Sequence, residues 1–117
     1  MGIFDILKTI AGAAGLPIQM PLKQAKTDAP NAMGCYKIFY RGLKYVGKAE
    51  DGIRKRFVQY YNGTTTHYPS AKKIFEHRDD ITVSWVVLTS RKECQETEDR
   101  WIDELAPEWN KQRGWKR

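Results

Sequence analysis

Residues 34–48 read Gly34-Cys-Tyr-Lys-Ile-Phe-Tyr-Arg-Gly-Leu-Lys-Tyr-Val-Gly-Lys48, and this stretch decides the fold. Two runs rich in β-branched and aromatic residues, 35–40 and 43–47, flank the dipeptide Arg41-Gly42. Runs of this composition favour β-strands, and a two-residue connection that contains glycine favours a tight turn between them. The stretch therefore predicts a β-hairpin.

A turn at this dipeptide also predicts which residues face each other: Tyr40 and Leu43, Ile38 and Tyr45, Tyr36 and Gly47. Because side chains alternate between the two faces of a strand, Tyr36 and Tyr45 then share one face as diagonal neighbours. Gly47 has no side chain and leaves room beside them. Two aromatic rings that merely stabilise a hairpin explain this arrangement as well as a functional pair does.

The other elements follow from hydrophobic periodicity and from the positions of proline and glycine. In chain order they are an amphipathic helix over 1–15, an irregular proline-containing linker over 17–34, helices over 51–61 and 67–77, a strand over 81–88 and a helix over 91–105. The order predicts a small α/β domain of the α+β kind, with a short three-stranded, largely antiparallel sheet flanked by helices. We expect residues 1–33 to form the helix and linker, and residues 34–117 the domain with a basic tail.

Charge points to a polyanionic partner. The 117 residues hold 20 Lys and Arg against 14 Asp and Glu, a formal net charge of +6. The segment 37–56 is basic and the segment 91–108 is acidic, although a solvated helix face explains either run alone. Cys35 and Cys94 have no second ligand at zinc spacing, which favours small buried residues in a reducing, cytoplasmic compartment. No apolar run is long enough to predict a transmembrane segment.

Helical spacing places one charged residue on the apolar face of each of two helices. Ile53, Arg56, Phe57 and Tyr60 follow the i, i+3, i+4, i+7 pattern, so the Arg56 guanidinium borders the core and needs an anion. On the helix over 91–105, the stripe is Cys94, Glu98, Trp101 and Leu105. Glu98 is thus expected to face inward, where an internal ion pair with Arg56 is the simplest structural explanation.

Five short motifs in order resemble the GIY-YIG nuclease family, and most closely the nuclease module of the bacterial nucleotide-excision repair endonuclease. They are Gly34-Cys35-Tyr36, Tyr45-Val46-Gly47, Arg56 with Tyr60 four residues later, Glu98, and Pro107-Glu-Trp-Asn110. The resemblance covers residues 34–110. Arg56 lies one residue further along than the family pattern expects, with the insertion near Gly52. If the loop does not absorb it, Arg54 or Lys55 takes the place of Arg56 in the site.

The resemblance implies a metal-dependent endonuclease that hydrolyses phosphodiester bonds of DNA. Glu98 would be the one protein ligand of a single Mg²⁺ or Mn²⁺ ion. Tyr36 would be the general base for the attacking water and Tyr45 its hydrogen-bonding partner. Lys48 and Arg56 would lower the tyrosine pKa, which is ordinarily near 10. Arg56 would also clamp the scissile phosphate.

Other residues complete the predicted site. Tyr60 would contact the phosphate or the leaving group, and Asn110 would hold the end of the helix that carries Glu98. The predicted DNA-binding residues are Lys48, Arg54, Lys55, Asn110 and Lys111. No sequence-reading module accompanies these motifs, so we expect low intrinsic sequence specificity.

Two other functions remain open from the sequence. One is a catalytically inactive nucleic-acid-binding module that has kept the groove. The other is a toxin-associated or phage-associated nuclease controlled by a partner protein. In either case the amphipathic helix over 1–15 is a candidate for binding a protein partner or for forming a homodimer.

Overall fold

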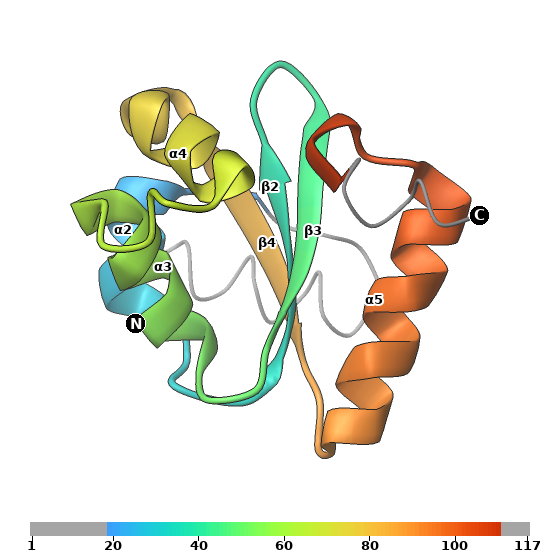
Figure 1. Ribbon diagram of the computed structural model, residues 1–117. Helices are drawn as coiled ribbons and strands as arrows, with labels where there is room; N and C mark the ends of the chain where they lie inside the picture. Colours follow the sequence, from blue (N-terminus) through green and yellow to red (C-terminus); the bar gives the residue numbers. More distant parts are fainter. Residues whose placement is uncertain (1–18, 111–117) are drawn as a thin grey trace.

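The computed structural model describes residues 19–110 and has the predicted α+β architecture (Figure 1). Its antiparallel sheet has the strand order β1-β4-β2-β3. The strands are β1 (Met20–Pro21), β2 (Gly34–Phe39), β3 (Leu43–Ala49) and β4 (Thr82–Val87). The fold class is confirmed, and the two-residue β1 adds a fourth strand to the three predicted. The helix expected over 1–15 lies outside the described residues.

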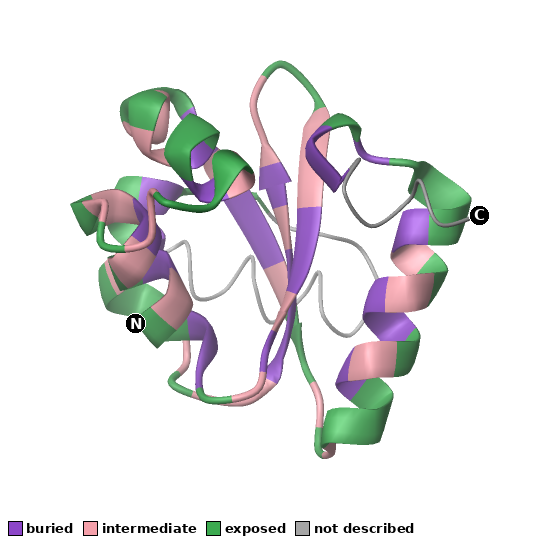
Figure 2. Ribbon diagram, in the orientation of Figure 1, coloured by how far each residue is buried: buried purple, intermediate pink, exposed green. Residues whose placement is uncertain are grey.

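Helices cover both faces of the sheet. Figure 1 shows α2 (Leu22–Asp28), α3 (Ile53–Asn62) and α4 (Pro69–Glu76) on one face, with α5 (Arg91–Leu105) and the short η2 (Glu108–Asn110) on the other. A second 3₁₀ turn, η1 (Arg78–Asp80), leads from α4 into β4. Figure 2 shows that the buried residues lie along the surfaces where helices and sheet meet. No helix in the described part of the chain is long and apolar enough to cross a membrane.

The hairpin register matches the prediction over most of its length. Tyr36 pairs with Gly47 and Ile38 pairs with Tyr45. The predicted pairing of Tyr40 with Leu43 is wrong, because the register shifts after Ile38 and Phe39 takes that place. The turn residues Arg41 and Gly42 both have positive φ, 54° and 101°. Because Phe39 pairs with Leu43, the connection has the three residues 40–42 and not the two predicted, and left-handed backbone is common in such loops.

The prediction of an irregular linker is wrong over residues 20–28, which form β1 and α2. Met20, Leu22 and Ala25 are fully buried, in the same core cluster as Tyr36. The prolines misled the prediction because they mark the ends of a helix: Pro21 immediately precedes α2, and Pro30 follows its C-cap. Proline is well tolerated at a helix start and stops a helix just beyond its end.

The two helices that carry Arg56 and Glu98 begin differently. Predicted bounds of α5 are confirmed, and the hydroxyl oxygen of Ser90 caps the helix by accepting from the Glu93 backbone N–H at 3.1 Å. The N-cap of α3 is Gly52, with φ 134°, so the predicted start at Asp51 is wrong. Leu105 is 42 % exposed and does not continue the buried stripe of α5 as predicted.

Candidate active site

A cleft of about 400 Å³ opens over β3, between the two helical layers. Side chains from both layers and from the sheet line it: Tyr36, Tyr45, Lys48, Glu50, Asp51, Arg56, Arg91 and Glu98. Four of the five predicted catalytic residues are therefore in one cleft. The fifth, Tyr60, lies directly behind it, where its hydroxyl shares a 2.5 Å hydrogen bond with the hydroxyl of Tyr36.

The tyrosines form a compact aromatic group. Tyr36 is fully buried, and its ring centroid lies 6.4 Å from that of Tyr45 and 5.8 Å from that of Tyr60. A Cβ atom added at Gly47 would lie 2.5 Å from the Tyr36 hydroxyl oxygen. The space that Gly47 leaves is thus filled by Tyr36 itself, because a larger residue would push this ring away.

Burial raises the pKa of the Tyr36 hydroxyl well above 10, and neighbouring Tyr60 and Tyr45 act in the same direction. Arg56 lowers this pKa but is outweighed. The pKa of Tyr60 is raised as well, again chiefly by burial. Arg56 therefore acts in the predicted direction, but the net pKa is raised, because the desolvation cost of a buried phenolate exceeds the attraction of the cation.

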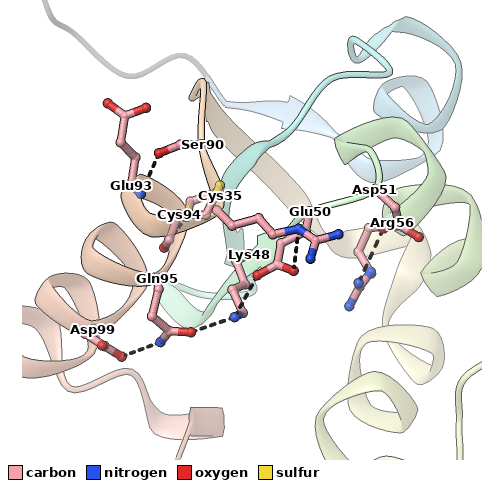
Figure 3. A network of polar contacts seen from close by, with 11 residues as sticks. Cys35, Lys48, Glu50, Asp51, Arg56, Ser90, Glu93, Cys94, Gln95 and Asp99 are labelled. Carbon is pink, nitrogen blue, oxygen red and sulfur yellow. Dashed lines mark hydrogen bonds and ion pairs between the residues drawn. The ribbon is translucent and has the colours of Figure 1, made fainter.

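Arg56 points into the cleft from the first turns of α3. Its Nε is buried and makes no hydrogen bond with residues 19–110, and its Nη2 lies 3.9 Å from the Asp51 carboxylate. A dashed line in Figure 3 marks this ion pair. Burial acts to lower the pKa of Arg56, but Tyr36, Tyr60 and Asp51 outweigh it and the pKa is raised. The guanidinium is thus a permanent, partly dehydrated cation that faces the cleft.

The extra residue before Arg56 is absorbed by the loop at Gly52. Arg54 and Lys55, the predicted substitutes, do not line the cleft. Arg54 donates from Nε to the Ala29 carbonyl at 2.8 Å and so ties α3 to the end of α2. Lys55 is exposed and pairs with Asp51 at 2.9 Å. Arg54 Nε is thus used in a structural hydrogen bond, and the DNA contact predicted for Arg54 stays a prediction.

Glu98 enters the cleft from α5, on the other side of the sheet from Arg56. Glu98 is 3 % exposed, and its Oε1 atom is buried. Among residues 19–110, the ion pair that Arg56 makes is with Asp51 and not with Glu98. The structural alternative of an Arg56–Glu98 pair is therefore wrong.

The carboxylate of Glu98 is a suitable ligand for a hard divalent cation. A buried carboxylate oxygen in a water-accessible cleft is the kind of ligand that Mg²⁺ and Mn²⁺ prefer. The described residues contain no group of three or more His, Cys, Asp or Glu side chains that could hold an ion unaided. An ion at Glu98 would take its other ligands from water and from substrate oxygens, as Mg²⁺ commonly does.

Across the cleft from Arg56 lies a chain of ion pairs and hydrogen bonds that we call the ionic rim: Lys48, Glu50, Arg91, Gln95 and Asp99. Lys48 Nζ lies 2.9 Å from Glu50 Oε2 and donates to Gln95 Oε1 at 2.6 Å, as seen in Figure 3. Gln95 in turn donates to Asp99 at 2.9 Å, and Arg91 Nε lies 3.7 Å from Glu50 Oε1. Only Lys48 of this rim was a predicted site residue.

Asn110 is 2 % exposed and fastens η2 to β3. Its Oδ1 accepts from the Val46 backbone N–H and its Nδ2 donates to the Val46 carbonyl, both at 2.9 Å. Both polar atoms of this buried side chain are thus used within the protein, and the predicted DNA contact stays a prediction. This clamp, which directly follows α5, is compatible with the predicted role in positioning the helix of Glu98. Lys111 lies outside the described residues.

The family model of the GIY-YIG catalytic domain matches residues 32–113. The chain therefore belongs to the GIY-YIG family, and the predicted class of nuclease domain is confirmed.

Two similar proteins are both UvrABC system protein C. UvrABC system protein C of Rhodococcus erythropolis is 29 % identical over 97 residues, and that of Streptomyces griseus is 29 % identical over 83 residues. These matches cover 81 % and 69 % of this chain but only 13 % and 11 % of the relatives.

Solved structures of the GIY-YIG N-terminal endonuclease domain of Thermotoga maritima UvrC share the fold. The magnesium-bound domain has a TM-score of 0.62 and 24 % identity, and the match covers 76 % of this chain and 94 % of that one. A point mutant of the same domain, bound to its catalytic divalent cation, gives a TM-score of 0.62 at 23 % identity, with 76 % and 94 % covered.

Proposed function

We propose that this chain is a metal-dependent endonuclease that hydrolyses phosphodiester bonds of DNA, with the activity carried by the predicted domain over residues 34–117 together with β1 and α2, which complete its core. The observation that carries the proposal is the meeting of Tyr36, Arg56 and Glu98 in one cleft, although they come from β2, α3 and α5. A phenol, a guanidinium and a buried carboxylate in one cleft have no common structural purpose, but together they can bind and cleave a phosphate diester.

Each residue has a role that its surroundings allow. Glu98 holds the single Mg²⁺ or Mn²⁺ ion, which when bound stabilises negative charge on the phosphate and on the leaving oxygen. Arg56 donates to the non-bridging oxygens of the scissile phosphate, since its Nε is buried and has no hydrogen-bond partner among the described residues. The cation in the Thermotoga maritima domain is magnesium, which supports the assignment.

The tyrosines position the attacking water. Tyr36 is the proposed general base and acts in that role only as the phenolate, a form that Arg56 favours and burial disfavours. Tyr60 fixes the orientation of the Tyr36 hydroxyl through their shared hydrogen bond. Tyr45, at the mouth of the same cleft, contacts the phosphate and the water.

The substrate is DNA recognised through its backbone. A net charge of +6 favours phosphate contacts, which carry no sequence information. In the cleft, Lys48, Arg56 and Arg91 can make such contacts beside an equal number of carboxylates. We therefore expect low sequence specificity, and the buried free thiols of Cys35 and Cys94 suit a reducing cytoplasm. The chain spans about an eighth of the UvrC relatives, so their whole-protein activity is not transferred to it.

Supercoiled plasmid tests the proposal directly. The full chain should nick or linearise it with Mg²⁺ or Mn²⁺, and EDTA should prevent this. Glu98→Gln should abolish cleavage, whereas Glu96→Gln, which removes the same charge from an exposed position on α5, should not. Plasmid that is bound but uncut by the parent protein with every metal would contradict the proposal and favour an inactive binding module.

A further inference from the structure

Glu50 lies in the loop between β3 and α3 and joins two cations of different elements. Its Oε2 lies 2.9 Å from Nζ of Lys48 on β3, and its Oε1 lies 3.7 Å from Nε of Arg91, the first residue of α5. All three side chains line the same cleft as Glu98. Two carboxylate oxygens that each face a different cation resemble the two non-bridging oxygens of a phosphodiester, which also carries one negative charge.

Lys48 does not depend on Glu50 for its position. Gln95 holds its ammonium group from the other side at 2.6 Å, and Asp99 orients the Gln95 amide at 2.9 Å, as Figure 3 shows. The cation would therefore stay in the cleft if the carboxylate of Glu50 moved away. A preorganised cation whose present anion is replaceable is suited to exchange that anion for a ligand.

We propose that Lys48 and Arg91 form a second phosphate-binding subsite beside the scissile one, and that Glu50 occupies it until a phosphodiester of the bound strand displaces it. The inference rests on the proposed endonuclease function and adds Arg91 and Glu50 to the residues that determine substrate affinity. Glu50 thus acts as a competitor within the chain, and it lowers the affinity of the cleft for a strand.

Exposure makes this exchange easy. The side chains of Lys48, Glu50 and Arg91 are 29 %, 31 % and 79 % exposed, so their ion pairs are weak and are screened by salt. A displaced Glu50 would also be repelled by the strand that replaces it. Removing its charge should therefore favour binding in two ways, by freeing the cations and by removing the repulsion.

Binding of labelled duplex DNA to the full chain in EDTA tests the subsite without cleavage. Glu50→Gln should lower the Kd roughly two- to fivefold at low salt, the range that an exposed ion pair supports. The difference should shrink as salt is raised. Glu96→Gln is the matched control, because it removes the same charge from an exposed position that does not line the cleft. A Kd that Glu50→Gln leaves unchanged, or lowers no more than the control does, would overturn the inference.

Arg91→Gln should weaken binding and reduce the salt dependence of log K by about 0.9, the slope of one duplex phosphate contact. Lys92→Gln, its exposed neighbour outside the cleft, is the control and should change the slope less. In the double variant, the gain from Glu50→Gln should be smaller than in the parent background. Fully additive effects would contradict a shared subsite.

Cleavage kinetics separate this inference from the function on which it rests. Glu50→Gln should lower KM with kcat unchanged, because the competition affects binding and not chemistry. A fall in kcat would show that Glu50 acts on the reacting groups, and it would overturn the competitor role while the endonuclease function stands. If the parent protein does not cleave, the endonuclease proposal fails, and the binding measurements still decide whether Lys48 and Arg91 bind phosphate.

Discussion

The two walls of the cleft differ in how far their polar and charged side chains are buried and in how these side chains are paired. The aromatic wall (Tyr36, Tyr60 and Arg56) is buried or half-buried, and its members hold one another through a short hydrogen bond and close packing. The ionic rim runs from half-buried Lys48 and Glu50 to exposed Arg91, and its charges are already paired with each other. Burial makes an electrostatic interaction strong, whereas water and salt keep the rim weak. The buried groups are therefore expected to control chemistry and the rim to adjust affinity.

Glu98→Gln should have the largest effect on cleavage. Glu98 is as buried as the aromatic wall, and its proposed cation supplies several kcal/mol, so loss of the carboxylate should cost about 10³-fold in kcat. Cleavage of a labelled duplex under single-turnover conditions measures this. A loss of less than about tenfold would place Glu98 outside the chemistry.

Arg56→Gln should follow, with a loss of about 10²- to 10³-fold in kcat, the usual cost of removing a donor to a developing oxyanion. Lys55→Gln is the matched control on the same helix, because Lys55 is exposed and pairs only with Asp51 among the ion pairs of residues 19–110. The control variant Lys55→Gln should change KM only slightly at low salt. Equal losses in the two variants would remove the distinction between a cation that lines the cleft and one that lies outside it.

Asn110→Ala should lower the free energy of unfolding, although it removes no contact of the aromatic wall. It leaves the Val46 N–H and carbonyl without their side-chain partner, and each buried group left unsatisfied costs about 1–3 kcal/mol. Urea denaturation should show this as a lower midpoint, whereas exposed Asn62→Ala should shift it little. Unchanged stability in Asn110→Ala would mean that the clamp is dispensable.

Alkaline pH should destabilise the protein through the aromatic wall. Because the folded-state pKa values of Tyr36 and Tyr60 are raised above 10, the unfolded chain loses these protons first as pH rises. Stability should be full below pH 10 and fall above it by up to about 1.4 kcal/mol per pH unit for each tyrosine. Tyr36→Phe should flatten this fall in urea titrations. Tyr68→Phe, whose ring is 59 % exposed, should leave it unchanged.

The sequence predicted the aromatic wall well because local periodicity encodes it. Alternation along two short strands placed Tyr36 beside Tyr45, and helical spacing placed Arg56 with Phe57 and Tyr60. Helical spacing also placed Glu98 on the inward face among the seven acids of the segment 91–108, and the family pattern gave it the role of metal ligand. The predicted hairpin register is wrong beyond Ile38, because the alternation of side chains along a strand does not reveal a β-bulge.

The ionic rim could not be predicted in the same way. Glu50 and Arg91 are far apart in the chain, and they meet only because the end of β3 lies beside the start of α5. Both are ordinary exposed charges in the sequence. The raised pKa of Tyr36 was also not predicted, because it depends on complete burial of the side chain. Periodicity indicates which face of a strand a residue occupies, but not how deeply its side chain is buried.

Anomalous diffraction from crystals grown with Mn²⁺ tests the central claim most directly, because it locates the ion without reference to activity. The account predicts one peak in the cleft at about 2.0–2.2 Å from a Glu98 carboxylate oxygen, the bond length of small divalent cations. A strongest peak held by Glu50 or Asp51, or a cleft with no peak at saturating Mn²⁺, would contradict it.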